Sequence, residues 1–237
     1  MEKEMEKNRR RSSVTVGESS SVSVLAQRYF RQTAELFGNQ LYLDSVPDLS
    51  HQGDALSLND FQEHICQCVK CPLGHTRTKF VFGVGDPHAD LVFVGEAPGR
   101  DEDFQGEPFV GRAGQLLDKI LAAIKLSRNE VYICNILKCR PPDNRTPHKD
   151  EIESCMPYLE EQLNIIKPKL IVALGTTAAH AFLKVKTPLG KLRSQKWKWQ
   201  NFDLVVTYHP AALLRNPAFK RPAWEDFQWV NKLMAET

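Results

Sequence analysis

The sequence predicts an α/β fold in which helices cover both faces of a central, mostly parallel sheet of four strands. Short, fully apolar runs alternate along the chain with longer segments whose apolar residues recur at helical spacing. Strands that alternate with amphipathic helices pair in parallel and are buried on both faces. This pattern predicts a three-layer α/β/α sandwich.

The first half of the pattern contains two strands and two helices. "DLVFVG" (90–95) is a short apolar strand, and "EVYICNIL" (130–137) is the second. Between them, "AGQLLDKILAAIKL" (113–126) is predicted to be an amphipathic helix, and "HKDEIESCMPYLEEQLNIIK" (148–167) is the next one. The apolar side of the first helix consists of Leu116, Leu117, Ile120, Leu121 and Ile124.

The second half repeats this arrangement. "KLIVALG" (169–175) is the third strand and leads directly into a short helix, "TTAAHAFL" (176–183). "FDLVVTYH" (202–209) is the fourth strand, and "PAWEDFQWVNKLMAE" (222–236) is the closing helix. In such sheets the active crevice lies beyond the carboxyl ends of the strands, so functional residues are expected directly after each strand.

The chain divides into an N-terminal extension, residues 1–59, and a folded domain, residues 60–237. The extension begins with a charged and then serine-rich tail that we expect to be disordered. Apolar residues at helical spacing predict a helix at 24–38 that ends at Gly38, and the turn-rich segment 39–56 is predicted to be a linker.

The composition predicts that the protein has no membrane-spanning segment and that it binds a polyanion. No run approaches about 18 apolar residues, and no apolar signal core is present, so we expect a cytoplasmic, nucleoid-associated monomer. Residues 181–237 hold ten basic and four acidic residues, a net +6, while the rest of the chain is at −4. This asymmetry indicates a basic, nucleic-acid-binding face, and the alternative is a merely solvated basic surface.

The cysteines suggest a metal centre. Metal binding is favoured over disulfides because there is no secretory signal. Cys68 and Cys71 have a spacing that lets two thiolates bind one metal; Cys139 ends a strand, and Cys155 lies about two turns into the next helix. Four thiolates on two chelating arms fit either Zn²⁺ or a [4Fe–4S] cluster. Cys134, inside its strand, is interpreted as a small buried hydrophobe, and the role of Cys66 stays open.

Three sequence blocks make the chain resemble a known family. "GEAPGRDEDFQGEPFVGRAGQLLDKIL" (95–121), "NILKCRPPDNRTP" (135–147) and "YHPAALLRNP" (208–217) are similar to the signature blocks of the iron–sulfur, or family 4, uracil-DNA glycosylases. The resemblance covers residues 60–237 in order. It implies a DNA-repair enzyme that flips uracil out of DNA and hydrolyses its N-glycosidic bond, with Cys68, Cys71, Cys139 and Cys155 holding a structural [4Fe–4S] cluster.

On this resemblance, two residues are expected to recognise the base. Phe109, in the loop after the first strand, offers a flat face on which a pyrimidine stacks. The amide of Asn135 offers an acceptor for uracil N3–H and a donor for O4. Because cytosine reverses both groups, a fixed amide leaves it unpaired.

The last strand is expected to supply the catalytic group. An imidazole N–H of His209 aimed at uracil O2 stabilises the negative charge that develops as the bond breaks. Main-chain N–H groups of Gly95, Glu96 and Ala97 are expected to meet the uracil oxygens. After His209, Leu213 or Leu214 is a candidate wedge into the base stack, and Arg215 is a candidate phosphate contact; these DNA contacts belong to the same expected site.

The sequence offers two candidates for the group that positions the attacking water. Related uracil glycosylases carry an aspartate in the first motif, where this chain has Ala97, so Glu96 and Glu102 are the candidate carboxylates.

Alternatives to the enzyme are a non-catalytic iron–sulfur nucleic-acid-binding module and an electron-transfer protein. Retention of Phe109, Asn135 and His209 argues against the first, and the wide cysteine separation against the second. Structural zinc is the alternative to the cluster.

Overall fold

The computed structural model describes residues 56–236. The predicted tail, the predicted helix at 24–38 and nearly all of the predicted linker lie outside the described residues. Helix α2 (Leu58–Ile65) contributes Leu58, Phe61 and Ile65 to the core, so the predicted boundary between residues 59 and 60 falls inside a packed helix. Ser57 caps this helix, because its hydroxyl accepts from the Asp60 N–H at 3.1 Å.

The central sheet contains the four predicted parallel strands and two short antiparallel ones. The parallel strands are β2 (Leu91–Gly95), β3 (Tyr132–Asn135), β4 (Leu170–Leu174) and β6 (Phe202–Thr207). β1 (Val84–Gly85) pairs antiparallel with β3, and β5 (Trp197–Trp199) pairs antiparallel with β6. The order is β1-β3-β2-β4-β6-β5. The prediction of four strands was therefore wrong in number, because edge strands of two and three residues show no apolar run.

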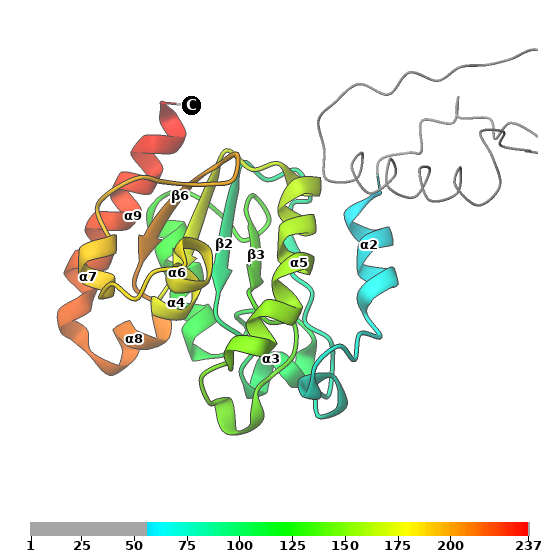
Figure 1. Cartoon of the computed structure of the whole chain (residues 1–237). Helices are drawn as coiled ribbons and strands as arrows, with labels where there is room; N and C mark the ends of the chain where they lie inside the picture. Colours follow the sequence, from blue (N-terminus) through cyan, green and yellow to red (C-terminus); the bar gives the residue numbers. More distant parts are fainter. Residues whose placement is uncertain (1–55, 237) are drawn as a thin grey trace, which may run out of the picture. The chain divides into compact units, whose positions relative to one another are not determined.

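Helices cover both faces of the sheet, as predicted, and Figure 1 shows the strands between them. One core lies under α2, α5 (Lys149–Ile166), α6 (Thr176–Leu183) and α7 (Leu189–Leu192). The other lies under α4 (Arg112–Ala123) and α9 (Lys220–Ala235). The remaining short elements are α3 (Arg100–Gln105), α8 (Pro210–Arg215), and the 3₁₀ turns η1 (Pro72–His75), η2 (Pro142–Asn144) and η3 (Pro217–Phe219).

The alternation of side chains along each strand produces the two cores. In β2, Val92 and Val94 face the core under α5, while Leu91 and Phe93 face the core under α4. All five β2 residues are buried, which explains why the strand reads as a continuous apolar run. Among residues 56–236, no helix is both long and apolar enough to cross a lipid bilayer.

Candidate active site

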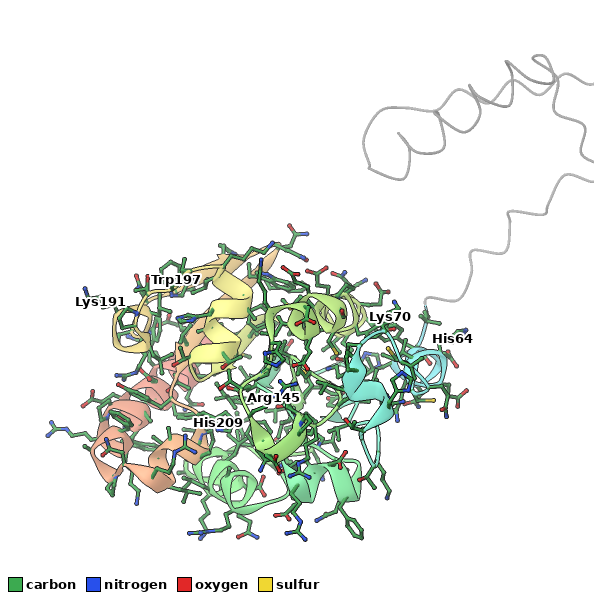
Figure 2. The ribbon with its side chains drawn as sticks, turned by 60° about the horizontal axis from the view of Figure 1, so that its bottom comes forward. His64, Lys70, Arg145, Lys191, Trp197 and His209 are labelled. Atoms are coloured by element: carbon green, nitrogen blue, oxygen red, sulfur yellow. The ribbon has the colours of Figure 1, made fainter. Side chains whose placement is uncertain are left out.

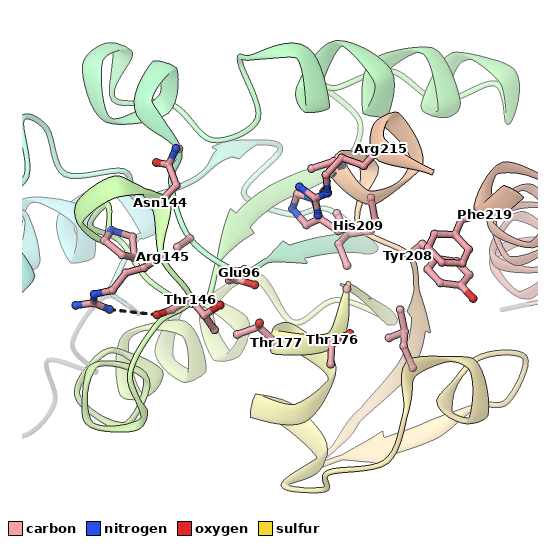
Figure 3. Close-up of a pocket in the computed structure, with 18 of the residues that line it drawn as sticks. Glu96, Asn144, Arg145, Thr146, Thr176, Thr177, Tyr208, His209, Arg215 and Phe219 are labelled. Carbon is pink, nitrogen blue, oxygen red and sulfur yellow. Dashed lines mark hydrogen bonds between the residues drawn. The ribbon is translucent and has the colours of Figure 1, made fainter. Parts of the chain in front are cut away.

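A cavity of about 680 Å³ lies where the parallel strands end. Its walls come from the loops that follow all four parallel strands, and it includes Glu96, Arg145, Thr176 and His209. Figure 3 shows these side chains around the cavity, with Arg215 beside His209. In Figure 2, which brings the lower end of Figure 1 forward, His209 and Arg145 lie on the near side of the sheet, and Lys191 and Trp197 lie off to one side. The crevice is where the parallel topology predicts it.

The hydrogen bond of His209 fixes which ring nitrogen carries the proton. His209 caps the N-terminus of α8, and its Nδ1 lies 3.1 Å from the Ala211 N–H, which can only donate. Nδ1 is therefore the acceptor, and in the neutral ring the proton is on Nε2. Desolvation lowers the pKa of His209 to about 4, with a smaller contribution from the nearby positive charge of Arg215. At neutral pH the site thus presents an uncharged imidazole whose Nε2–H has no acceptor within residues 56–236.

Gly95, Phe109 and Asn135 form a tightly packed group beside His209. The Phe109 ring stacks on the imidazole, with centroids 5.3 Å apart and planes at 27°. A Cβ on Gly95 would overlap the Asn135 Oδ1 and lie 2.7 Å from the Phe109 Cζ, so only glycine fits there. Asn135 is 2% exposed and Phe109 is 5% exposed, and neither lines the open cavity. The predicted base-reading residues therefore lie together in a buried wall behind it.

The Asn135 amide is free to bind a ligand. Within residues 56–236 its side chain has no hydrogen-bond partner, although its main-chain carbonyl accepts from Lys138 at 2.9 Å. The N–H groups of Glu96 and Ala97 likewise have no acceptor in the described part of the chain, whereas the carbonyl of Glu96 accepts from the Leu137 N–H at 3.1 Å. Free donors and a free amide are what recognition of a uracil edge requires.

Glu102 fastens two loops of the site together. Its carboxylate accepts from the N–H groups of Val110 and Gly111, both at 3.0 Å, and from the N–H of Gly99 at 3.1 Å. These contacts join the loop after β2 to the loop that carries Phe109. Because its oxygens are occupied by main-chain donors, the geometry favours a positioning role for Glu102 over activation of water.

Arg128, which the sequence did not single out, holds the Phe109 loop from the other side. Its guanidinium donates to the Phe109 carbonyl at 3.1 Å, to the Pro108 carbonyl, and to Asp118 at 3.1 Å. The backbone of Phe109 has a φ of 55°, a conformation that residues other than glycine seldom adopt. These bonds help to keep the ring in that strained position against His209. No local sequence motif connects Arg128 with a loop about twenty residues away.

Helix α8, which follows His209, presents Leu214 and Arg215 outward. Leu214 is 41% exposed, whereas Leu213 is 2% exposed and packs inward. Of the two leucines predicted as candidate wedges, only Leu214 is accessible, because the buried side chain of Leu213 cannot enter a base stack.

Several cations of the basic segment, residues 181–237, are engaged in ion pairs. Lys196 and Lys198 contact Asp203 at 3.2 and 2.6 Å, and Arg193 is buried against Asp226. Arg193 therefore adds little to the basic face expected for residues 181–237, because its side chain is 10% exposed and is paired with Asp226. Arg215 lines the cavity and has no ion pair among the described residues.

The four predicted ligands, Cys68, Cys71, Cys139 and Cys155, lie near enough to interact: Cys68 and Cys71 act on Cys139, and Cys139 and Cys71 act on Cys155. Arg77 donates to the Cys139 Sγ at 3.4 Å, and the Tyr158 hydroxyl donates to the Cys68 Sγ at 3.2 Å. Burial raises the pKa of Cys155 to about 11, and the thiols of Cys139 and Cys71 add to this increase. No three His, Cys, Asp or Glu side chains in residues 56–236 converge on one ion position.

The other two cysteines face elsewhere. Cys134 is 1% exposed inside β3 and packs in the core, and Cys66 donates to the Glu63 carbonyl at 3.2 Å. All six cysteines have free thiols.

Lys138 provides an independent indication of an anionic centre beside these thiols. Its side chain is fully buried, and within the described residues its Nζ donates only to the Asn135 carbonyl. A buried ammonium has three donors and is costly without a compensating negative charge. Burial lowers the pKa of Lys138 and so disfavours its charged form, while the neighbouring thiols of Cys134, Cys155 and Cys139 act in the opposite direction. Metal-bound thiolates at Cys139 and Cys155 would supply a negative charge that keeps this ammonium protonated, so the charge balance around Lys138 fits such a centre.

Comparison with known proteins agrees with this fold and identifies its family. The family model described as the uracil DNA glycosylase superfamily matches residues 82–228. Type-4 uracil-DNA glycosylase of Archaeoglobus fulgidus is 45% identical over 185 residues, which cover 75% of this chain and 93% of that protein. Type-4 uracil-DNA glycosylase of Thermotoga maritima is 44% identical over 170 residues, 70% of this chain and 88% of that protein.

More distant relatives are also found. Type-5 uracil-DNA glycosylase of Pyrobaculum aerophilum is 32% identical over 146 residues, 54% of this chain and 64% of that protein. The chain belongs to the uracil-DNA glycosylase superfamily and, within it, to the type-4 uracil-DNA glycosylases.

Proposed function

We propose that the protein is a DNA-repair glycosylase that hydrolyses the N-glycosidic bond of uracil in DNA and leaves an abasic site. The observation that carries this proposal is the neutral His209 imidazole, whose free Nε2–H lies in a cavity beside Phe109 and Asn135. The type-4 uracil-DNA glycosylases to which the chain is 39–45% identical support the same reaction.

Recognition of the base begins when the nucleotide rotates out of the DNA stack, at a cost of a few kcal/mol. In our proposal the uracil ring lies against Phe109, and the free Asn135 amide accepts from N3–H and donates to O4. Stacking on an aromatic side chain contributes about 1–3 kcal/mol. Because cytosine presents the opposite pattern, the same amide would leave it unpaired in a nearly solvent-free wall.

Bond cleavage leaves negative charge on the uracil ring, and His209 is placed to stabilise it. A neutral donor is suited to this task, because it stabilises the developing charge at O2 without giving up its proton. The free N–H groups of Glu96 and Ala97 provide further donors for the uracil oxygens. Of the two candidate carboxylates, we assign the water-positioning role to Glu96. It lines the cavity, and its side chain has no hydrogen-bond partner in residues 56–236.

Cys68, Cys71, Cys139 and Cys155 would hold a [4Fe–4S] cluster with a structural role. Such a centre would tie the loop after Asn135, the last residue of β3, to the segment before β1. Lys138 supports this proposal, since its buried ammonium lies among the thiols and donates to the Asn135 carbonyl. Brown protein with an absorption band near ~400 nm and about four irons per chain would support iron. Stoichiometric zinc and no colour would support the zinc alternative.

Uracil-containing DNA is the proposed partner. Leu214 would enter the base stack as the nucleotide leaves it, and Arg215 would contact a phosphate. Arg215 also lowers the pKa of the His209 imidazole, so DNA binding and catalysis share this residue.

The proposal is tested with labelled DNA that contains a single uracil. Incubation with the full chain, followed by alkali, should break the strand at that position only, and DNA with cytosine there should remain intact. Binding of the DNA with no alkali-sensitive site, by protein that retains its metal, would instead support the non-catalytic nucleic-acid-binding module.

A further inference from the structure

A buried ion pair lies beside β6, the strand that ends two residues before His209. Arg193, which follows α7, donates to Asp226 of α9 through Nε at 2.6 Å and through Nη2 at 2.8 Å. The same Nη2 donates to the Pro222 carbonyl at 2.6 Å. The two side chains are 10% and 4% exposed. Because desolvation cancels much of the attraction in such pairs, stability alone is a weak reason for this one.

Asp226 also binds the last residue of β6. The Thr207 hydroxyl donates to the Asp226 Oδ2 at 2.6 Å, so the carboxylate has accepted three hydrogen bonds. On its other side, the Thr207 carbonyl accepts from the Gly175 N–H at 2.8 Å. The end of β6 is therefore held by its side chain and by its main chain at once.

The next residue, Tyr208, belongs to the same network. The Arg193 guanidinium lies 4.6 Å from the centroid of the Tyr208 ring. Phe219 stacks on that ring with centroids 4.4 Å apart and planes at 8°, and Figure 3 shows this stack at the edge of the cavity. The consecutive residues Thr207 and Tyr208 are thus connected to α9 through Asp226 and Arg193, and Tyr208 is also connected through Phe219 to the turn before α9.

His209 follows these two residues without a break. The hydrogen bond from Ala211 to Nδ1 sets the tautomer of the ring, but the main chain before His209 sets where the ring lies. The clearance is small, because a Cβ on Gly175 would come 2.9 Å from the His209 Cβ. A shift at Thr207 would therefore displace the imidazole toward or away from the base.

We infer that Arg193, Thr207 and Asp226 are positioning residues that hold His209 at the distance needed to stabilise the departing uracil. This inference rests on the proposed function of His209. It assigns a role to a basic residue that the sequence had suggested for phosphate binding.

Two substitutions test the inference. Thr207→Val keeps the shape of the side chain but removes its hydrogen bond, and Asp226→Asn removes the charge that holds Arg193. Since a misplacement of about 1 Å can cost about 100-fold in rate, we expect single-turnover excision to fall by about 10-fold and about 100-fold, respectively. The dissociation constant for uracil-containing DNA should stay within about 2-fold, because positioning acts on the chemical step. Thr207→Val gives the answer alone if Asp226→Asn does not fold.

A double-mutant cycle separates positioning from general damage. In a His209→Ala background, Thr207→Val should lower the remaining rate by less than about 2-fold, because its effect passes through the missing imidazole. Equal losses in both backgrounds would overturn the inference. Leu204→Ala, a buried change in the same strand that removes no hydrogen bond, is the matched control. It should lower Tm, and a rate loss equal to that of Thr207→Val would also overturn the inference.

A readout without substrate keeps this inference separate from the proposed function. In the wild-type chain the ¹⁵N and ¹H resonances of the His209 imidazole report the Nε2–H tautomer, and Thr207→Val should shift them. If the wild type excises uracil and Thr207→Val leaves both the resonances and the rate unchanged, the inference is wrong. If the resonances shift but the wild type excises no uracil, the positioning network stands and the proposed function fails.

Discussion

At the scale of single residues, the site depends on a histidine that stays neutral. A His209 pKa of about 4, compared with 6.5 for an unperturbed histidine, means that the unfolded chain binds this proton at a higher pH than the folded chain does. The unfolded state therefore holds more protons between these two values, and this histidine lowers stability as pH falls from about 6.5 to about 4.

The first prediction follows from this loss of stability as the pH falls. Over this range the wild type should lose more unfolding free energy than His209→Gln, in which the titrating group is absent, as measured by urea denaturation at a series of pH values. The carboxylates that titrate in the same range are common to both proteins and cancel in the comparison. Parallel pH curves for the two proteins would show that His209 titrates normally in the folded state.

A second prediction concerns base reading by Asn135. Asn135→Asp should lower the single-turnover rate on uracil by roughly 10- to 100-fold, since a buried group left unpaired costs about 1–3 kcal/mol. Asn164→Asp, the same change at an exposed position of α5, is the control and should have no effect. Uracil kinetics that are unchanged in Asn135→Asp would remove Asn135 from the base-binding wall.

At the scale of elements, the four parallel strands and the helices α4, α5, α6 and α9 could be predicted because each has a strong apolar pattern. β1 and β5 could not, because edge strands of two and three residues bury too little to leave a pattern. Asn135 and His209 were found because they end or directly follow strands. The roles of Arg128 and of the Arg193–Asp226 pair could not be predicted from the sequence. Their interacting residues are 10 to 33 positions apart, and only the folded chain brings them together.

The third prediction tests the loop between β3 and α5. Cys139→Ala and Cys155→Ala should each remove bound metal and lower Tm, because metal binding contributes directly to folding free energy. Cys134→Ala should retain the metal, since that thiol faces the core inside β3. Metal content by mass spectrometry and thermal unfolding measure the two effects. A chain that needs Cys134 but not Cys139 would contradict the proposed ligand set.

At the scale of the whole molecule, the distribution of charge decides how DNA is approached. The net +6 of residues 181–237 suggested a broad basic face, but several of these cations are already paired within the protein. Two arginines line the cavity: Arg145 is paired with Glu151 at 2.6 Å, whereas Arg215, from α8, has no ion pair within residues 56–236. DNA contact should therefore centre on the carboxyl end of the sheet and not on β5.

The fourth prediction is a salt titration of DNA binding. Arg215→Gln should reduce the magnitude of the log–log slope of affinity against salt concentration by about one, the change expected for one lost phosphate contact. Lys198→Gln, which removes a cation already paired with Asp203, should leave the slope unchanged. If Lys198→Gln reduces the slope and Arg215→Gln does not, DNA approaches the molecule along β5.

The central claim is that the His209 Nε2–H stabilises the transition state of uracil excision, and single-turnover kinetics of His209→Ala test it most directly. Loss of one such donor typically lowers the rate by about 10²–10³-fold, or about 3–4 kcal/mol, while an interaction that strengthens only in the transition state leaves binding nearly intact. We therefore predict a rate loss of about this size, with a dissociation constant for uracil-containing DNA that stays within about 2-fold of the wild type. A dissociation constant that rises steeply while the excision rate constant is preserved would contradict the claim and make His209 a DNA-binding residue.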